Sequence, residues 1–133
     1  ELLQSFDVPV YGPLNESIAT VSHPLREGDQ VNLEEMSLNL KVLDTPGHTR
    51  GHIAYYGSNP FNVVFCGDTL FAGSIGRTDL PGGSFQEILE SLTMIMQSFD
   101  DETRVFPGHG PETTIGNEKK MNPYILEYLN CIN

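Results

Sequence analysis

The stretch VLDTPGHTRGH, residues 42–52, ends an apolar run at an Asp and places a histidine directly after a Pro-Gly turn. The longer run SLNLKVLD at 37–44 alternates apolar and polar residues, which predicts a half-buried strand that ends at Asp44. A single histidine beside Pro-Gly is commonly an ordinary turn residue. Whether His48 is a ligand at the end of a strand therefore depends on the rest of the chain.

The same arrangement occurs twice more. The run VVFCGD ends at Asp68, and the run RVFPGH ends at His109. In each case a glycine follows the apolar strand and allows a sharp turn before a side chain that can bind metal. Neighbouring strands lie about 5 Å apart, so three such ends on one edge of a sheet could direct two imidazoles and one carboxylate at one cation. We therefore predict a shared metal site made of His48, Asp68 and His109.

The identity of the metal stays open at this point. Three ligands of these types leave coordination positions free, which is typical of a catalytic zinc site rather than a structural one. Two histidines with one carboxylate also match the ligand set of non-haem iron enzymes. The spacing of the three residues does not decide between zinc and iron.

Three further residues are candidates for the site. His52 stands four residues after His48, just before a predicted strand, and would either orient a ligand or the turn, or simply pack as a structural histidine. Arg77 lies in the glycine-rich run AGSIGRTDLPGG, nine residues past Asp68. It would either hold the anionic end of a substrate together with Asp79 or form an ion pair with Asp79.

The remaining pattern predicts one α/β domain of the α+β type over residues 1–133, a sheet covered on one face by helices. Ser84 is the expected N-cap of the clearest helix, with Glu87 completing a capping box. Asn122 is the expected N-cap of a last helix. His23 is expected in a surface loop. We expect strands at 8–12, 37–44, 53–57, 62–68 and 103–110, and helices at 1–6, 84–99 and 122–129.

Composition excludes some kinds of partner. The chain has 133 residues and a net charge of -11, from 7 Lys and Arg against 18 Asp and Glu, which argues against binding nucleic acid or an anionic membrane. No apolar run approaches the roughly 18 residues of a membrane-spanning helix. Two cysteines, Cys66 in a strand and Cys131 as a free thiol, favour a reducing compartment, and we expect the cytoplasm.

Four runs then carry a family resemblance: TPGHTRGH, FCGDTLF, GSIGRTD and FPGHGPETTIGNEKKMNP. In order and spacing they resemble the metallo-β-lactamase superfamily, and within it the glyoxalase II-like hydrolases. The resemblance implies a four-layer αβ/βα sandwich with two metal ions, zinc by expectation and iron or manganese as alternatives, at one edge between two sheets. It also implies that His48 completes the ligands of the first metal, Asp68 bridges both metals and His109 binds the second.

The chain departs from the family pattern in two ways, which affect the expected activity of the isolated chain and the expected substrate. The upstream Thr-His-x-His-x-Asp-His motif is absent, so the chain resembles only the later part of a single domain, with the N-terminal portion missing. We expect the isolated chain to bind metal poorly, to self-associate and to be inactive. The loop Gly76–Asp79 and Pro111 also replace the Lys and Tyr residues that contact glutathione in glyoxalase II proper, and Gly-Arg-Thr-Asp occurs in persulfide dioxygenases.

The expected function follows from this resemblance. It implies a hydrolase in which metal-bound hydroxide attacks a small-molecule thioester of the hydroxyacylglutathione type, with Asp68 holding the nucleophile. One alternative is an oxidoreductase similar to the mononuclear iron persulfide dioxygenases. The other is a half-domain without catalytic activity.

Overall fold

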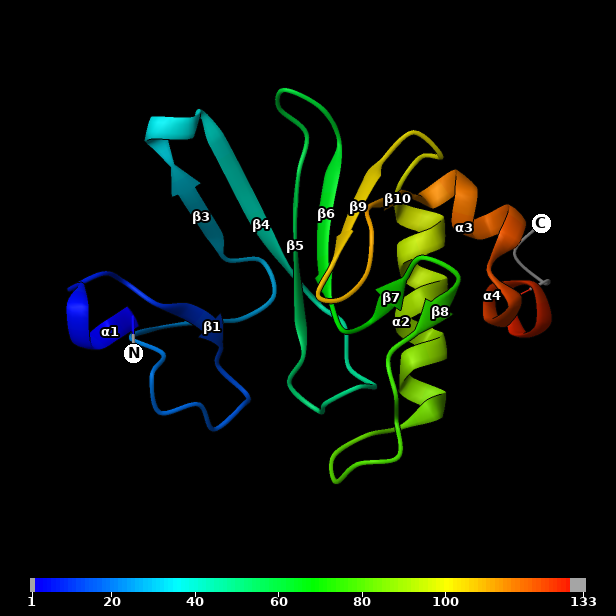
Figure 1. Cartoon of the computed structure of the whole chain (residues 1–133), viewed down its shortest axis with the longest axis horizontal. Helices are drawn as coiled ribbons and strands as arrows, with labels where there is room; N and C mark the ends of the chain where they lie inside the picture. Colours follow the sequence, from blue (N-terminus) through cyan, green and yellow to red (C-terminus); the bar gives the residue numbers. More distant parts are fainter. Residues whose placement is uncertain (1, 130–133) are drawn as a thin grey trace.

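The computed structural model describes residues 2–129, and its centre is a mixed sheet (Figure 1). The strands lie in the order β10-β9-β6-β5-β4-β3, and within this sheet only β6 and β9 are parallel neighbours. The six strands are β3 (Gln30–Leu33), β4 (Leu38–Asp44), β5 (Ile53–Gly57), β6 (Val63–Gly67), β9 (Arg104–Pro107) and β10 (Thr113–Thr114).

The directions of the strands place three chain turns at one edge of the sheet. β4 and β6 are both antiparallel to β5, so they run the same way, and β9 is parallel to β6. The carboxyl ends of β4, β6 and β9 therefore point to the same edge. These are the strands that precede His48, Asp68 and His109, as the sequence pattern requires.

Helix α2 (Phe85–Ser98) covers one face of the sheet. Ile88, Leu92 and Ile95 are completely buried against sheet residues such as Val64 and Val105. These positions form the apolar face of the helix. Phe85 is an exception, because it is 42% exposed at the first turn.

The start of α2 also anchors the turn that precedes His48. Ser84 is the N-cap as predicted, since its Oγ accepts a hydrogen bond from the Glu87 N–H at 3.2 Å. The full capping box was wrong, because the Ser84 N–H donates to the Gly47 oxygen at 2.8 Å instead. A Cβ on Gly47 would lie 2.3 Å from the Ile88 Cβ, so only glycine allows this close approach.

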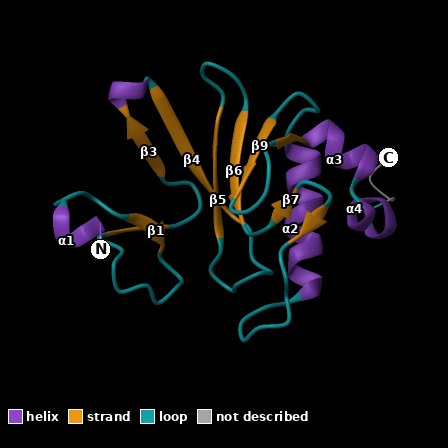
Figure 2. Ribbon diagram, viewed as in Figure 1, coloured by secondary structure: helices purple, strands orange, loops and turns teal. Residues whose placement is uncertain are grey.

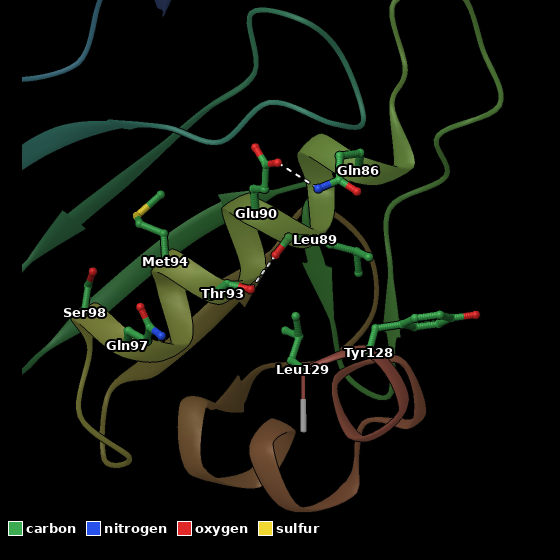
Figure 3. A pocket seen from close by; sticks show the side chains of 9 residues that line it. All are labelled: Gln86, Leu89, Glu90, Thr93, Met94, Gln97, Ser98, Tyr128 and Leu129. Atoms are coloured by element: carbon green, nitrogen blue, oxygen red, sulfur yellow. Dashed lines mark hydrogen bonds between the residues drawn. The ribbon is translucent and has the colours of Figure 1, made fainter. Parts of the chain in front are cut away.

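Two short helices follow the sheet. In α4 (Pro123–Tyr128), the predicted N-cap is confirmed, because Asn122 Oδ1 accepts from the Tyr124 N–H at 3.1 Å. α3 (Ile115–Met121) was not predicted. Figure 3 shows the groove between α2 and α4, with Leu89 and Thr93 on one side and Leu129 on the other.

A two-stranded hairpin, β7 (Leu70–Phe71) and β8 (Ser74–Ile75), lies between the end of β6 and the start of α2 in the chain. The sequence pattern predicts no strand in this stretch. Each strand has two residues, too few to show an alternating pattern. The hairpin begins two residues after Asp68 and ends two residues before Arg77, so both of its ends adjoin the candidate site.

The N-terminal part, drawn at the opposite end from α3 and α4 in Figure 2, packs beside β3 and β4. The predicted strand at 8–12 is displaced, because β1 (Tyr11–Pro13) pairs in parallel with β2 (His23–Leu25). His23 lies in β2 rather than in the predicted surface loop, although its side chain is exposed as expected. The other elements here are α1 (Leu2–Ser5) and the 3-10 helix η1 (Glu34–Met36).

The face of the sheet opposite α2 is also apolar but is partly open. Phe65 is 36% exposed and stacks on Phe106 with 5.3 Å between ring centroids. These rings, with Met36 and Phe61, line a shallow apolar hollow of about 270 Å³. A sheet with apolar side chains on both faces is typical of the interior of a layered fold.

Cys66 is fully buried in β6, as predicted, and this burial raises the pKa of its thiol to about 11. Cys131 lies outside the described residues. Within residues 2–129, none of the helices has the length and apolar character needed to cross a membrane.

Candidate metal centre

The Asp68 carboxylate lies between the two histidines that the sequence pattern selected. The His48 Nε2 is 3.4 Å from Asp68 Oδ2, and the His109 Nδ1 is 2.9 Å from Asp68 Oδ1. Each side chain comes from the turn that follows a different strand of the same sheet. The structure therefore brings all three predicted ligands together at one edge.

The hydrogen bonding of His48 suits a metal ligand. Its Nδ1 lies 2.8 Å from the Arg77 carbonyl oxygen. A carbonyl only accepts, so Nδ1 carries a proton and donates, and Nε2 is the ring nitrogen that faces Asp68. Proteins orient a metal-ligating histidine in this way, with one ring N–H donating to a backbone carbonyl so that the other nitrogen can bind the cation.

His52 contacts the backbone of Asp68. Its Nε2 accepts a hydrogen bond from the Asp68 N–H at 3.1 Å, so the proton of the neutral ring is on Nδ1. That Nδ1 lies 2.8 Å from the Thr45 Oγ1 and 3.2 Å from the Thr69 Oγ1. Burial and the nearby His48 lower the pKa of His52, which favours the neutral ring. These contacts favour the interpretation that His52 orients the turn at Asp68.

Three glycines let the backbone close around Asp68. Gly67 has a positive φ of 53°, and its oxygen accepts from the Gly108 N–H at 2.7 Å. A Cβ on Gly108 would lie 2.5 Å from Asp68 Oδ1, and one on Gly76 would lie 1.7 Å from the Asp68 carbonyl oxygen. Gly76 and Gly108 are therefore required by packing against Asp68, whereas a Cβ on Gly67 would lie 2.8 Å from the His52 Nε2.

The donor set fits a divalent cation in its chemistry but is not arranged as a closed ligand shell. Among residues 2–129, no group of three or more His, Cys, Asp or Glu side chains is positioned as a metal site. His48 and His109 contact different oxygens of the carboxylate instead. The imidazoles of His48 and His109 and the carboxylate of Asp68 are the groups that could hold zinc or iron.

Arg77 and Asp79 form the ion pair that was one of the two interpretations of this loop. The Arg77 Nε and Nη2 donate to the two carboxylate oxygens of Asp79 at 2.8 and 2.7 Å. Both side chains are well exposed. The pair neighbours the site, because the carbonyl of Arg77 holds His48. The sequence did not predict that contact, since a main-chain oxygen leaves no signal in the residue type.

An open groove of about 470 Å³ lies beside the candidate ligands. His48, His52 and Asp68 form one part of its lining, and Tyr11 and Ile18 form another. It has the size of a small-molecule site.

Comparison with known families agrees with this geometry. Residues 4–109 match the family model of the Metallo-beta-lactamase superfamily, and the chain belongs to that superfamily. This confirms the resemblance and the mixed α/β fold class seen in the sequence.

Individual relatives and solved structures show which members of the superfamily this chain is similar to. The chain is 51% identical over 116 residues to a hydroxyacylglutathione hydrolase from Nitrosomonas eutropha, covering 87% of this chain and 42% of that protein. Among solved structures, ETHE1 from Myxococcus xanthus superposes with a TM-score of 0.80 at 33% identity, over 97% of this chain and 61% of that one. TTHA1623 in a di-iron-bound form has a TM-score of 0.77 at 37% identity, over 92% and 68%.

The chain thus spans less than half the length of this hydrolase relative.

Proposed function

We propose that this chain is part of a metal-dependent hydrolase that cleaves a small-molecule thioester of the hydroxyacylglutathione type. The observation that carries the proposal is the placement of His48, whose Nδ1 donates to a carbonyl while its Nε2 faces Asp68 at 3.4 Å. The 51% identity to a hydroxyacylglutathione hydrolase supports the choice of substrate.

His48, Asp68 and His109 would hold the metal, with Asp68 between two ions in the complete domain. We propose zinc, with iron or manganese as alternatives. When bound, such a metal lowers the pKa of a water molecule and polarises a carbonyl. The chain's own residues fix the geometry: the Arg77 carbonyl orients His48, and His52 holds the backbone N–H of Asp68.

Arg77 and Asp79 are the proposed substrate contacts. Because the Arg77 guanidinium is paired in a bidentate manner with Asp79, an anionic substrate group would have to compete with this carboxylate. The pair is exposed to water, where such an ion pair adds little stability. A substrate carboxylate could therefore replace Asp79 as the partner of Arg77 with little loss of free energy.

A second candidate is an iron-dependent oxidoreductase similar to the persulfide dioxygenases. The Gly-Arg-Thr-Asp run at 76–79 and the likeness to ETHE1 favour it. It would use the same His48, Asp68 and His109 on one iron with oxygen as co-substrate. The third candidate, a half-domain without catalytic activity, applies to the isolated residues 1–133.

We also propose that residues 1–133 form part of one domain, since they span 42% of the hydrolase relative. We expect the isolated chain to bind metal weakly and to lack activity. The composition argument for a reducing compartment makes the cytoplasm the proposed location.

The test uses the full-length protein that contains this chain, assayed for hydroxyacylglutathione hydrolysis and for metal content. Two zinc ions per chain with thioester cleavage support the hydrolase, whereas one iron with thiol-dependent oxygen uptake supports the oxidoreductase. Asp68→Ala should remove activity and metal together. Asp7→Ala, a change at an exposed carboxylate, should alter neither. Near-normal turnover and metal content in Asp68→Ala would refute the proposed role of Asp68.

A further inference from the structure

A buried carboxylate lies behind the candidate metal centre. Glu118 in α3 is only 1% exposed, and in the described part of the chain it is the one charged side chain buried to this degree. Its Oε1 accepts from the Gly73 N–H at 2.7 Å and from Asn122 Nδ2 at 3.0 Å. Its Oε2 accepts from the Thr113 Oγ1 at 2.6 Å and from Asn117 Nδ2 at 3.1 Å.

Asn122 extends these contacts to both strands of the β7–β8 hairpin. Its side chain is completely buried, and its Nδ2 donates to the Ser74 carbonyl at 3.0 Å and to the Phe71 carbonyl at 3.4 Å. The Gly73 N–H in the turn of the hairpin donates to Glu118. The side chains of Glu118 and Asn122 therefore hold the turn and both strands of the hairpin.

The same hairpin also contacts or adjoins the candidate ligands. At its base, the Gly76 N–H donates to the Thr69 carbonyl at 3.1 Å, next to Asp68. The Phe71 ring meets the His109 ring edge-on with 5.9 Å between centroids. The carbonyl of Arg77, two residues after β8, accepts from His48. One short hairpin therefore touches or adjoins all three ligand candidates.

We infer that Glu118 and Asn122 are positioning residues that set the geometry of His48, Asp68 and His109 through the β7–β8 hairpin. Burying a carboxylate lowers the stability of the folded protein unless hydrogen-bond donors are fixed around it. A protein with a well-packed apolar group in its place would often be no less stable. The four donors around Glu118 define the position of the hairpin turn more closely than apolar packing would. The inference concerns side-chain geometry first, and its consequence for metal binding rests on the proposed function.

The test compares Glu118→Gln with Thr103→Val, a matched loss of a buried polar contact, because the Thr103 Oγ1 donates to Asp100 in the turn before β9. Both variants are studied metal-free by NMR, through the amide exchange of Gly73 and the ring signals of His48 and His109. Zinc affinity is then measured by competition with a chelating dye in the full-length protein. The unfolding free energies of both variants show whether they lose similar stability.

We expect Glu118→Gln to speed exchange at Gly73 by about tenfold or more and to shift the ring signals of both histidines. Zinc affinity should fall by about 10-fold or more, the range found when groups that orient metal ligands are removed. Thr103→Val should leave all three readouts unchanged. Should Glu118→Gln fail to fold, Thr113→Val, which removes a single donor to the carboxylate, should give the same shifts at smaller size.

If Glu118→Gln loses as much stability as Thr103→Val but leaves the histidine signals and zinc affinity unchanged, the two residues are structural only and the inference is wrong. If the ring signals shift in Glu118→Gln while the unsubstituted full-length protein binds no metal, the positioning role stands and the proposed function fails.

Discussion

His109 and Asp68 are 41 residues apart in the chain, and their side chains meet with 2.9 Å between Nδ1 and Oδ1. The contact follows from the sheet, because the strands before these residues are its parallel neighbours β6 and β9. The Gly108 N–H donates to the Gly67 oxygen at 2.7 Å and joins the two turns just before the side chains diverge. The pair is therefore fixed by topology and by two glycines.

A methyl group at Gly108 should displace Asp68. The added Cβ would lie 2.5 Å from Asp68 Oδ1, so Gly108→Ala should move the carboxylate and weaken zinc binding by about 10-fold or more. Overpacking of this kind costs on the order of 1–3 kcal/mol. Zinc titration and urea unfolding of the full-length variant measure the two effects.

Gly110→Ala is the matched control for this prediction. Gly110 has a positive φ of 79° but open space around its Cβ position, so alanine there should cost about 1 kcal/mol of stability without moving Asp68. Equal losses of zinc affinity in the two variants would show that the close approach at Gly108 does not matter.

His52 should act through Asp68 rather than as a metal ligand. Removing its ring by His52→Ala leaves the Asp68 N–H without its acceptor, which should cost roughly 1–3 kcal/mol. Metal affinity should fall but the metal count at saturation should stay the same. Metal analysis at saturating zinc checks this, with His23→Ala as the control because His23 is exposed in β2. A lower metal count at saturation would make His52 a ligand.

The stability contributed by Glu118 should depend on pH. Burial raises the pKa of this carboxyl, but the hydrogen bonds from Thr113, Gly73, Asn122 and Asn117 outweigh it, so the pKa lies below the ordinary value of 4.5. A depressed pKa stabilises the fold above the unfolded value, and this contribution is lost as pH falls through the folded value. The difference in unfolding free energy between the parent and Glu118→Gln should therefore be full at pH 7 and shrink below about pH 4.5. Urea unfolding across this range measures it, and a difference independent of pH would contradict the assignment.

The open face of the sheet should make the isolated 133-residue chain self-associate. Phe65 and Phe106 stack on this face and line an apolar hollow with Phe61. Contiguous exposed apolar surface of this kind favours association. Sedimentation should show a concentration-dependent increase in mass that Phe65→Thr reduces. Met121→Gln, at a residue that is 67% exposed on α3, should not reduce it. A monomer at all concentrations would contradict this expectation.

The sequence predicted the parts of the structure that have a strong periodic or turn signal. The strands before His48, Asp68 and His109 alternate or form apolar runs that end at glycine, and α2 carries a helical apolar face, so these elements were found. α3 and the β7–β8 hairpin were missed, because IGNEKKM has little apolar periodicity and two-residue strands have none. The capping box at Glu87 failed because the Gly47 turn, distant in sequence, took over the Ser84 N–H.

At the candidate site, too, the sequence predicted some features and missed others. The types and spacing of His48, Asp68 and His109 were readable from the sequence, since each follows a strand and a glycine. The groups that hold them were not, because the Arg77 carbonyl and the Asp68 N–H belong to the main chain and carry no signature of residue type. Of the two interpretations of Arg77, the ion pair with Asp79 is the one that the structure contains.

The central claim is that His48, Asp68 and His109 share a metal centre, and anomalous diffraction from crystals of the metal-loaded full-length protein tests it most directly. We expect an anomalous peak at the absorption edge of the bound metal within about 2.0–2.2 Å of a ring nitrogen of His48 and an oxygen of Asp68. His109 should bind the same ion or a second one bridged by Asp68. A metal bound elsewhere in the protein, with these three side chains uncoordinated, would contradict the account.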